Sequence, residues 1–278
     1  MESQDGAELC FPQLLNTSCR KPTAQSNAVF LNILLVSVSV LTVFLNLLVV
    51  ISVSHFRQLH TPTNILLLSL AVSDFLVGLL LMPGEIFRLT TCWFLGDVMC
   101  SLYKYLSCIV YSTSIGDMVL ISVDRYVAVS DPLHYPTRVT VRRVKLSVCL
   151  CWLYYFFYSG LYLKNDLTQP DRYNSCYAVT LQRSVTLTTK KSELKAARTL
   201  GVLVLGFLMC FCPYYCVSLA GDSVFNGSSA SYVVFLYYFN SCLNPVIYAL
   251  FYPWFRKSVK LVVTLQILQT GSCEANVQ

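Results

Sequence analysis

Six apolar runs, each about twenty residues or longer, limit what this 278-residue chain can fold into more than any other feature. A helix needs about 20 mostly apolar residues to cross the hydrocarbon core of a bilayer. Only 12% of the residues are charged, whereas a soluble domain carries about 25%. The sequence therefore predicts an all-α membrane protein with spans at 28–54, 63–83, 98–129, 144–163, 199–220 and 230–252.

The charges between the runs predict an orientation, because cytoplasmic loops carry an excess of Lys and Arg. Residues 130–145 hold four such side chains, whereas 84–97 hold only Arg88. We therefore expect residues 1–26 outside the cell, and this segment carries the N-glycosylation sequon of Asn16. The net charge of +6 then fits basic loops beside an anionic leaflet, and no nucleic-acid partner is expected.

The segment 164–198 conflicts with this orientation. Four crossings from an extracellular N-terminus end outside the cell near residue 164. The next run, 199–220, follows four Lys and Arg residues and precedes a second sequon at Asn226, so it should begin inside. No apolar stretch within 164–198 is long enough to cross. Either 199–252 inserts inverted, or the polar residues 164–198 lie in lipid.

The sequence disfavours two other classes of membrane protein, an enzyme and a transporter. The three histidines, His55, His60 and His134, all lie in predicted loops, and no paired carboxylates or metal-ligand spacing accompany them. A transporter would be expected to show inverted repeats and broken helices at the midplane, and neither is visible in the sequence. We therefore expect no catalytic residue, metal centre or cofactor, a sodium ion excepted.

Polar residues inside the apolar runs carry a family resemblance. A charge at mid-bilayer costs roughly 2.5–3.5 kcal/mol on insertion scales, so such residues usually have a role. The set comprises Asn46 in FLNLLVV, Asp74 in LAVSDFLVG, Asp124-Arg125-Tyr126, Trp152, Pro213 in FLMCFCPYY, and NSCLNPVIYALFYPWF at 240–255. In this order and spacing they resemble the rhodopsin-like G-protein-coupled receptors over nearly the whole chain. The last segment and LHTPTNILLLSLAVSDFLVG resemble the trace amine-associated receptors among them.

The resemblance implies a rhodopsin-like helix bundle in the plasma membrane. Six of the seven spans are recognisable, and a short amphipathic helix should follow the last one. The fifth helix of the family is absent from the sequence between about Tyr177 and Leu181. We expect an extracellular tail at 1–26, the bundle with its amphipathic helix at 27–265, and a cytoplasmic tail at 266–278.

The resemblance also assigns two sets of polar residues inside the bundle. Asp74 is expected to bind a sodium ion, and the alternative is an ordinary hydrogen bond between helices. Arg125 is expected to be paired locally in the silent receptor and released toward a heterotrimeric G protein in the active one. The polar network is Asn46, Asp74, Asn240 and Asn244, and the switch is Asp124, Arg125, Tyr126, Tyr248 and Glu193. Glu193 could equally be a solvated partner of nearby lysines.

One disulfide is implied between Cys100 and Cys176, which would tie the third helix of the family to an extracellular loop. An oxidising exterior permits such a bond. The other cysteines in polar stretches, Cys10, Cys19, Cys92 and Cys273, remain disulfide candidates without an assigned partner.

The expected ligand site departs from that of the family. Amine receptors hold the ammonium with an Asp on the third helix, and Ser107 stands at that position here. Glu85 is the nearest remaining acid, and Asp117 is expected to bond to Trp152 or Ser69 as a structural residue. An aromatic lining suits a cation through its ring faces, although ordinary packing is the alternative. The expected lining is Ser107, Val110, Tyr111, Phe211, Tyr214, Tyr215 and Tyr238.

These features predict a receptor for small, volatile amines that signals through a heterotrimeric G protein in olfaction. We expect the absent helix to impair signalling. The alternative is a truncated receptor that does not signal and acts as a dimerisation or trafficking partner of another receptor.

Overall fold

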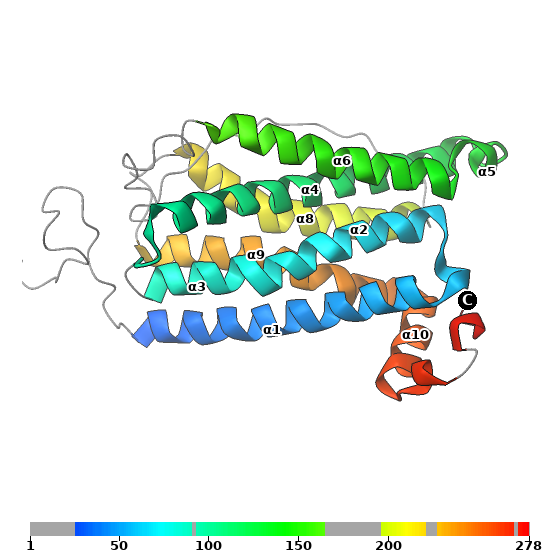
Figure 1. The fold of residues 1–278 in the computed structure, drawn as a ribbon, viewed down its shortest axis with the longest axis horizontal. Coiled ribbons are helices and arrows are strands. Elements are labelled where there is room, and N and C mark those ends of the chain that lie inside the picture. Colours follow the sequence, from blue (N-terminus) through cyan, green and yellow to red (C-terminus); the bar gives the residue numbers. More distant parts are fainter. Residues whose placement is uncertain (1–25, 91–92, 165–195, 221–226, 270–271, 278) are drawn as a thin grey trace, which may run out of the picture.

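The computed structural model describes residues 26–90, 93–164, 196–220, 227–269 and 272–277, and within these ranges the chain is built from helices. Long helices lie side by side along one axis (Figure 1). They are α1 (Ser26–His55), α4 (Gly96–Ser130), α6 (Val141–Tyr162), α8 (Ala196–Ala220) and α9 (Gly227–Phe251), together with a rod made of α2 (Pro62–Leu76), the π-helical η2 (Val77–Leu81) and α3 (Met82–Thr90). Short helices are η1 (Arg57–Leu59), α5 (Tyr135–Arg138), α10 (Pro253–Val263), η5 (Gln266–Leu268) and η6 (Ser272–Glu274).

Five of the six predicted spans are confirmed as helices long and apolar enough to cross a membrane. They are Val29–His55, Pro62–Arg88, Val98–Ser130, Val141–Tyr162 and Val233–Phe251. The remaining run, predicted at 199–220, forms the 25-residue helix α8, whose described apolar stretch is the shorter Val204–Tyr214. The bundle is therefore the expected one.

The predicted end of the second span at residue 83 is wrong, because the helix continues to Thr90. Pro83 has no N–H, and its ring crowds the carbonyl four residues earlier, which normally kinks a helix. The wider π turn of η2 lies directly before this proline and accommodates it without ending the helix. Glu85 and Arg88 consequently lie on a helix rather than in a loop.

Local sequence explains where two of the helices begin. The Thr61 side chain accepts a hydrogen bond from the Asn64 backbone N–H at 3.3 Å, and Pro62 occupies the first turn of α2. Thr140 caps α6 in the same way, through the Arg143 N–H at 3.4 Å. Both caps satisfy donors that a helix start leaves unpaired.

The core is concentrated between α1, α2 and α9, and α6 lies at the edge. Leu67 and Leu70 of α2 are completely buried, as are Val49 and Val53 of α1. In the Pro62–Arg88 helix, 67% of the most apolar stretch is buried inside the bundle. In α6, only 11% of the corresponding stretch is buried. Most of α6 would therefore contact lipid or another protein.

The directions of the helices show that α8 does not insert inverted, which was one of the two alternatives left open by the sequence. Phe211 of α8 packs against Tyr237 of α9 (ring centroids 4.7 Å apart), and Gly206 lies beside Leu243 further along α9, so the two helices are antiparallel. Since α9 leads into α10, α8 begins at the end of the bundle where α5 and α10 lie (Figure 1). α6 runs from that end to the opposite one, so residues 165–195 connect opposite ends of the bundle.

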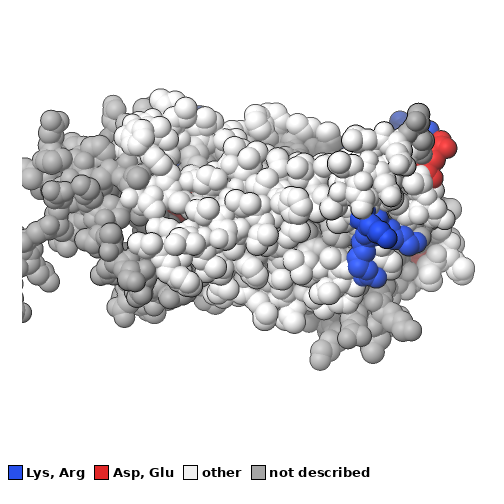
Figure 2. Space-filling view, turned by 90° about the horizontal axis from the view of Figure 1, so that it is seen from below, with Lys and Arg blue, Asp and Glu red and all other residues white. Residues whose placement is uncertain are grey.

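The distribution of charge fits a bilayer around the middle of the bundle. On the face drawn in Figure 2, basic side chains gather near one end, and the described surface along the rest of the bundle is almost free of charge. α10 lies at this end and is amphipathic as expected, with Phe255 buried and Arg256 and Lys257 exposed. The end that carries α5 and α10 is therefore the cytoplasmic end.

The segment after α10 folds back onto the first cytoplasmic connection. The His55 ring Nε2 lies 2.9 Å from the Ser272 hydroxyl, and the Gln58 amide donates to the Glu274 carbonyl at 3.2 Å. Val277 is completely buried in a small cluster with Phe56. The predicted tail from 266 onward is thus packed where the structure describes it.

Candidate functional site

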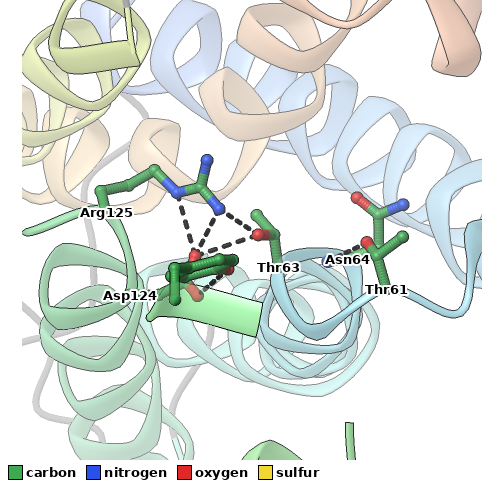
Figure 3. Close-up of polar contacts among 6 residues, drawn as sticks. Thr61, Thr63, Asn64, Asp124 and Arg125 are labelled. Carbon is green, nitrogen blue, oxygen red and sulfur yellow. Dashed lines mark hydrogen bonds and ion pairs between the residues drawn. The ribbon is translucent and has the colours of Figure 1, made fainter. Parts of the chain in front are cut away.

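An ion pair at the cytoplasmic end of α4 is surrounded by further hydrogen bonds. Arg125 donates through Nε to Asp124 Oδ2 at 2.9 Å, and its Nη2 donates to the Thr63 hydroxyl of α2. The Thr63 hydroxyl donates in turn to Asp124 Oδ2 at 3.0 Å. Figure 3 shows Arg125 and Thr63 both turned toward Asp124. Arg125 is therefore paired locally, in the arrangement that the resemblance implies for the silent receptor.

Tyr135 completes this cluster, and the sequence alone did not identify it. Its hydroxyl donates to Asp124 Oδ1 at 2.7 Å from the short helix α5. Partial burial raises the pKa of the Tyr135 phenol above its usual range, so it stays a donor. Its position eleven residues after Asp124, in a connection rather than a span, gave no periodic signal. Asp124 is thus held from α2, α4 and α5.

The other predicted switch residues lie apart from the pair. Tyr126 is 71% exposed, on the outside of α4. Tyr248 of α9 is completely buried, with its ring against Tyr252 and Phe255, and its hydroxyl has no hydrogen-bond partner within the described residues. Glu193 lies outside the described residues.

Two members of the predicted polar network are brought into direct contact in the core. Asn244 of α9 donates through Nδ2 to Asp74 Oδ2 of α2 at 2.7 Å. Asn46 of α1 donates through Nδ2 to the Ser241 carbonyl at 2.9 Å rather than to Asp74. Asn240 is buried as well. The Oδ1 atoms of Asn46, Asp74 and Asn240 are all buried without a partner among the described residues.

Asp117 has the structural partner that the sequence suggested. The Ser69 hydroxyl lies 2.8 Å from Asp117 Oδ2, and the Trp152 indole donates to the Ser69 oxygen at 3.0 Å. The contact with Trp152 is therefore made through Ser69. This chain of hydrogen bonds joins α2, α4 and α6 near the middle of the bundle.

A second ion pair lies at the outer end of the bundle, on α3. Arg88 donates to the two Glu85 oxygens, through Nη2 at 2.6 Å and through Nε at 3.1 Å. The Tyr103 hydroxyl of α4 lies 3.3 Å from Glu85 Oε2 and 3.1 Å from the Leu81 carbonyl, and it can donate to either. Glu85, expected as an acid available to an amine, is therefore already paired with a guanidinium.

Tyr103 approaches α3 closely because Gly84 has no side chain. A Cβ at Gly84 would meet the Tyr103 ring at 2.5 Å, closer than real contacts allow. Trp93 packs on the other side of Tyr103, with ring centroids 6.1 Å apart, and its indole donates to the Gly96 carbonyl at 3.0 Å. The position of Tyr103 is therefore tightly determined.

Ser107 and Val110, expected to line the ligand site, are present on this part of α4. The Ser107 hydroxyl donates to the Tyr103 carbonyl at 2.7 Å, a bond within its own helix. Val110 is buried among Tyr238 and other apolar side chains. Ser107 thus cannot substitute for an acid, and no described hydrogen bond directs it toward another helix.

The predicted aromatic lining exists, but Tyr237 is its centre and was not predicted. The Tyr237 ring contacts Tyr111, Phe211 and Tyr214, with centroids 4.7, 4.7 and 4.5 Å apart. Tyr238, which was predicted, contacts Tyr111 at 6.2 Å. Adjacent tyrosines on a helix point about 100° apart, so the sequence alone could not decide which of the two faced α8. The side chain of Tyr215 lies outside the described residues.

The structure describes only some of the residues predicted to form disulfides or to carry glycans. Cys100 is buried and disulfide-bonded, while its predicted partner Cys176 lies outside the described residues, as do the sequons of Asn16 and Asn226. Cys273 is a free thiol beside η1 at the cytoplasmic end, so its candidacy for a disulfide is wrong.

Known proteins match this chain over nearly its whole length. A family model described as "7 transmembrane receptor (rhodopsin family)" matches residues 45–186 and 172–248. Trace amine-associated receptor 13c of Danio rerio is 34% identical, over 99% of this chain and 97% of the relative. Trace amine-associated receptor 7e of Mus musculus is 34% identical (99% and 93%), and receptor 8a of Rattus norvegicus is 34% identical (97% and 96%).

The way in which the family model and the relatives align with this chain agrees with the predicted position of the absent fifth helix. The family match comes in two pieces that meet at 172–186, between α6 and α8. The alignment with receptor 13c runs over 335 positions, more than the 278 residues of this chain, so the relative has residues without a counterpart here. Family model, relatives and helix bundle agree, and the chain belongs to the trace amine-associated receptors of the rhodopsin family of seven-transmembrane receptors.

Proposed function

We propose that this chain senses small amines and passes the signal to a heterotrimeric G protein through Arg125. As a member of its family it is a multi-pass protein of the plasma membrane and not an enzyme. The single observation that supports the proposal is the arrangement around Asp124, where a carboxylate holds Arg125 with help from Thr63 and Tyr135. Separating these elements would leave the guanidinium at the cytoplasmic end held only by its neighbour Asp124.

The names of the relatives and the aromatic cluster at the outer end support an amine as ligand. The relatives carry "trace amine" in their names. The rings of Tyr111, Phe211 and Tyr214 pack around that of Tyr237 in tilted and edge-on arrangements across α4, α8 and α9. A cation against the face of such a ring gains about 0.5–2 kcal/mol.

Nucleotide exchange on a panel of G proteins, in membranes of cells that express the intact chain, would test this function. A panel of small amines, with and without a carboxylate, should stimulate exchange through at least one member, and Arg125→Ala should abolish the response. Arg125→Lys keeps the charge but loses the planar fork of donors, so it should retain part of the response. Labelling at the cell surface would show that both variants reach the membrane. No response of the intact chain to any amine would refute the proposal.

A sodium ion bound by Asp74 is part of this proposed function. Three buried side-chain oxygens without partners, on Asn46, Asp74 and Asn240, are the kind of ligand that a hard cation prefers. The ion would stabilise the closed packing of α1, α2 and α9. Sodium should therefore weaken agonist binding more than equimolar N-methylglucamine, and Asp74→Asn should remove the difference.

An olfactory role is also proposed, on the resemblance to the family alone. It predicts that transcripts of this chain occur in sensory neurons of the olfactory epithelium. Their absence there, with expression elsewhere, would contradict this part.

A second candidate function, a partner that binds another receptor without signalling, is favoured by the surface of α6. Tyr154, Tyr158 and Tyr162 form an exposed ladder with stacked rings 5.9 and 6.1 Å apart, and Tyr154 lies near the middle of this helix. Burying the Tyr154 and Tyr158 hydroxyls in hydrocarbon without a partner would be costly. A helix of another receptor could supply the acceptors that lipid lacks.

Co-purification distinguishes the two functions. The partner function predicts that the chain is recovered with full-length trace amine-associated receptor 13c from shared membranes. It also predicts that Leu substitutions of the three ladder tyrosines reduce this recovery. A response of the chain alone to amines, in cells without another receptor of the family, would exclude it.

A further inference from the structure

Glu85, the acid at the outer end of the bundle whose side-chain contacts the structure describes, is paired with Arg88. The Glu85 side chain is 8% exposed, and its two oxygens accept from two nitrogens of Arg88. The Arg88 side chain is 19% exposed, so solvent reaches neither group freely. A ligand whose only charge is an ammonium would have to displace Arg88 in order to pair with Glu85.

Four tyrosines surround this pair. Tyr103 and Tyr238 interact electrostatically with Arg88, and Tyr214 interacts with both Glu85 and Arg88. Tyr111 interacts with Glu85 and with the other three tyrosines. The charged side chains with which these tyrosines interact include Glu85 and Arg88. The pair is therefore a neutral unit within an aromatic layer.

Tyr111 provides a second observation that points to a ligand in this layer. Its hydroxyl is buried and interacts with the Tyr238 hydroxyl, but this contact does not reach full hydrogen-bonding geometry. Buried hydroxyls are normally hydrogen-bonded. A hydroxyl held in this way is available to a polar group of a ligand in this layer.

Displacement of Arg88 by a simple amine would leave a guanidinium unpaired. Removing one partner of a buried ion pair is strongly unfavourable, because the remaining charge stays uncompensated. A ligand with an ammonium and a carboxylate avoids this cost. Its ammonium takes the place of Arg88 at Glu85, and its carboxylate binds the released guanidinium, which presents a fork of donors suited to carboxylates.

We propose that the ligand is a zwitterion, an amine that also carries a carboxylate, with Glu85 binding its ammonium and Arg88 binding its carboxylate. The proposal rests on the proposed function only in using the same outer site as the place of ligand binding. It makes Arg88 a specificity-determining residue, and it accounts for a site in which Ser107 replaces the acid and Glu85 is already paired. The tyrosine rings would contact the apolar body of the ligand.

The test compares three probes that share one aromatic body: phenylalanine, phenethylamine and 3-phenylpropionate. Binding to the purified full chain in lipid nanodiscs is measured by competition and by ligand-induced thermal stabilisation. Phenylalanine should bind about 10- to 100-fold more tightly than either probe with a single charge, the range that one charge-assisted hydrogen bond contributes. Equal or tighter binding of phenethylamine would overturn the inference.

Two variants reverse the preference if each charge binds the opposite charge of the ligand. Arg88→Gln frees Glu85, so phenethylamine should become the best probe. Glu85→Gln frees Arg88, so 3-phenylpropionate should become the best probe. The double variant Glu85→Gln/Arg88→Gln removes both charges and should bind the three probes within about threefold of one another. A pair with only a structural role would weaken all probes alike in each variant.

Binding and signalling are read separately, so the two proposals fail in different ways. Phenylalanine binding without nucleotide exchange would refute the proposed signalling and leave the inference intact. Exchange driven by phenethylamine but not by phenylalanine would refute the inference and leave the signalling intact. A folded chain, verified by cooperative thermal unfolding, that binds none of the three probes also contradicts the inference.

Discussion

The bundle has a buried ion pair at each end, and the two differ in how they are held. Both join neighbouring residues of one helix, Asp124 with Arg125 and Glu85 with Arg88. The exposed fractions are similar, 3% and 8% for the carboxylates and 22% and 19% for the arginines. Asp124 also accepts hydrogen bonds from α2 and α5, whereas the further hydrogen-bond neighbour described for Glu85 is Tyr103 of α4.

This difference suggests different tasks for the two pairs. Opening the cytoplasmic pair would break contacts between three elements, so it is coupled to their relative positions. The outer pair can exchange partners within α3 while the helices stay in place. A ligand that shifts an equilibrium must interact differently with two states. The outer pair is suited to binding and the cytoplasmic pair to switching.

Removing the carboxylate of Asp124 should have the largest effect. Asp124→Ala deletes charge-assisted hydrogen bonds worth about 1.5–3 kcal/mol each, so the ratio of open to closed receptor should rise about 10- to 100-fold. Ligand-independent nucleotide exchange in membranes would measure this change. An unchanged basal rate would show that the cytoplasmic pair does not hold the silent state.

The matched control is Asp131→Asn. Asp131 also pairs with a histidine and an arginine, His134 and Arg138, but these partners are mostly exposed. Exposed pairs contribute about 0–1 kcal/mol. This variant should leave basal exchange within about fivefold of wild type, which separates the effect of the buried pair from a general loss of negative charge.

The second prediction tests how far the outer pair depends on Tyr103. Gly84→Ala places a methyl group 2.5 Å from the Tyr103 ring, so the ring must move away from Glu85. Such overpacking typically costs about 1–3 kcal/mol. Gly201→Ala is the control, because no atom lies within 4 Å of the added methyl group. It should be neutral or stabilising, since alanine favours a helix over glycine.

Thermal unfolding of the purified variants checks this comparison between the two glycines. A melting temperature for Gly84→Ala equal to that of wild type would mean that Tyr103 relaxes without loss. The outer pair would then be less constrained than its hydrogen bonds indicate.

The helices and the polar core were largely predictable from the sequence, because both follow from what a bilayer permits. Apolar runs gave five spans, and intramembrane Asp74 and Asn244 do meet, at 2.7 Å. Asp117 has Ser69 as its partner, as expected. The spans follow from composition, and the polar network follows from the family resemblance.

Three features of the candidate sites could not be predicted from the sequence. The pairing of Glu85 with Arg88 required the second helix to continue past Pro83, which follows from the π turn and not from hydropathy. Tyr135 lies in a connection, where no period reports which way a side chain points. Choosing Tyr237 over Tyr238 required the rotation of α9 about its axis.

A smaller effect is expected from Tyr135→Phe, which removes one of the bonds to Asp124. The loss of a hydrogen bond is worth about 0.5–1.5 kcal/mol, so basal exchange should rise about two- to tenfold. The double variant Asp124→Ala/Tyr135→Phe should equal Asp124→Ala alone, because the acceptor is already gone. Additive effects would show that Tyr135 acts on another partner and that α5 does not help to hold the cytoplasmic pair.

The smallest expected effect is that of pH on this same bond. The folded state raises the pKa of the Tyr135 phenol above its ordinary value of about 10. The group therefore contributes stability that is fully present below about pH 10 and is lost as pH rises through the higher folded pKa. The difference in melting temperature between wild type and Tyr135→Phe should stay constant from about pH 6 to pH 9 and shrink only above about pH 10. A difference that already shrinks near neutral pH would mean that another titrating group controls the bond, and the cytoplasmic pair would then be the pH-sensitive one of the two.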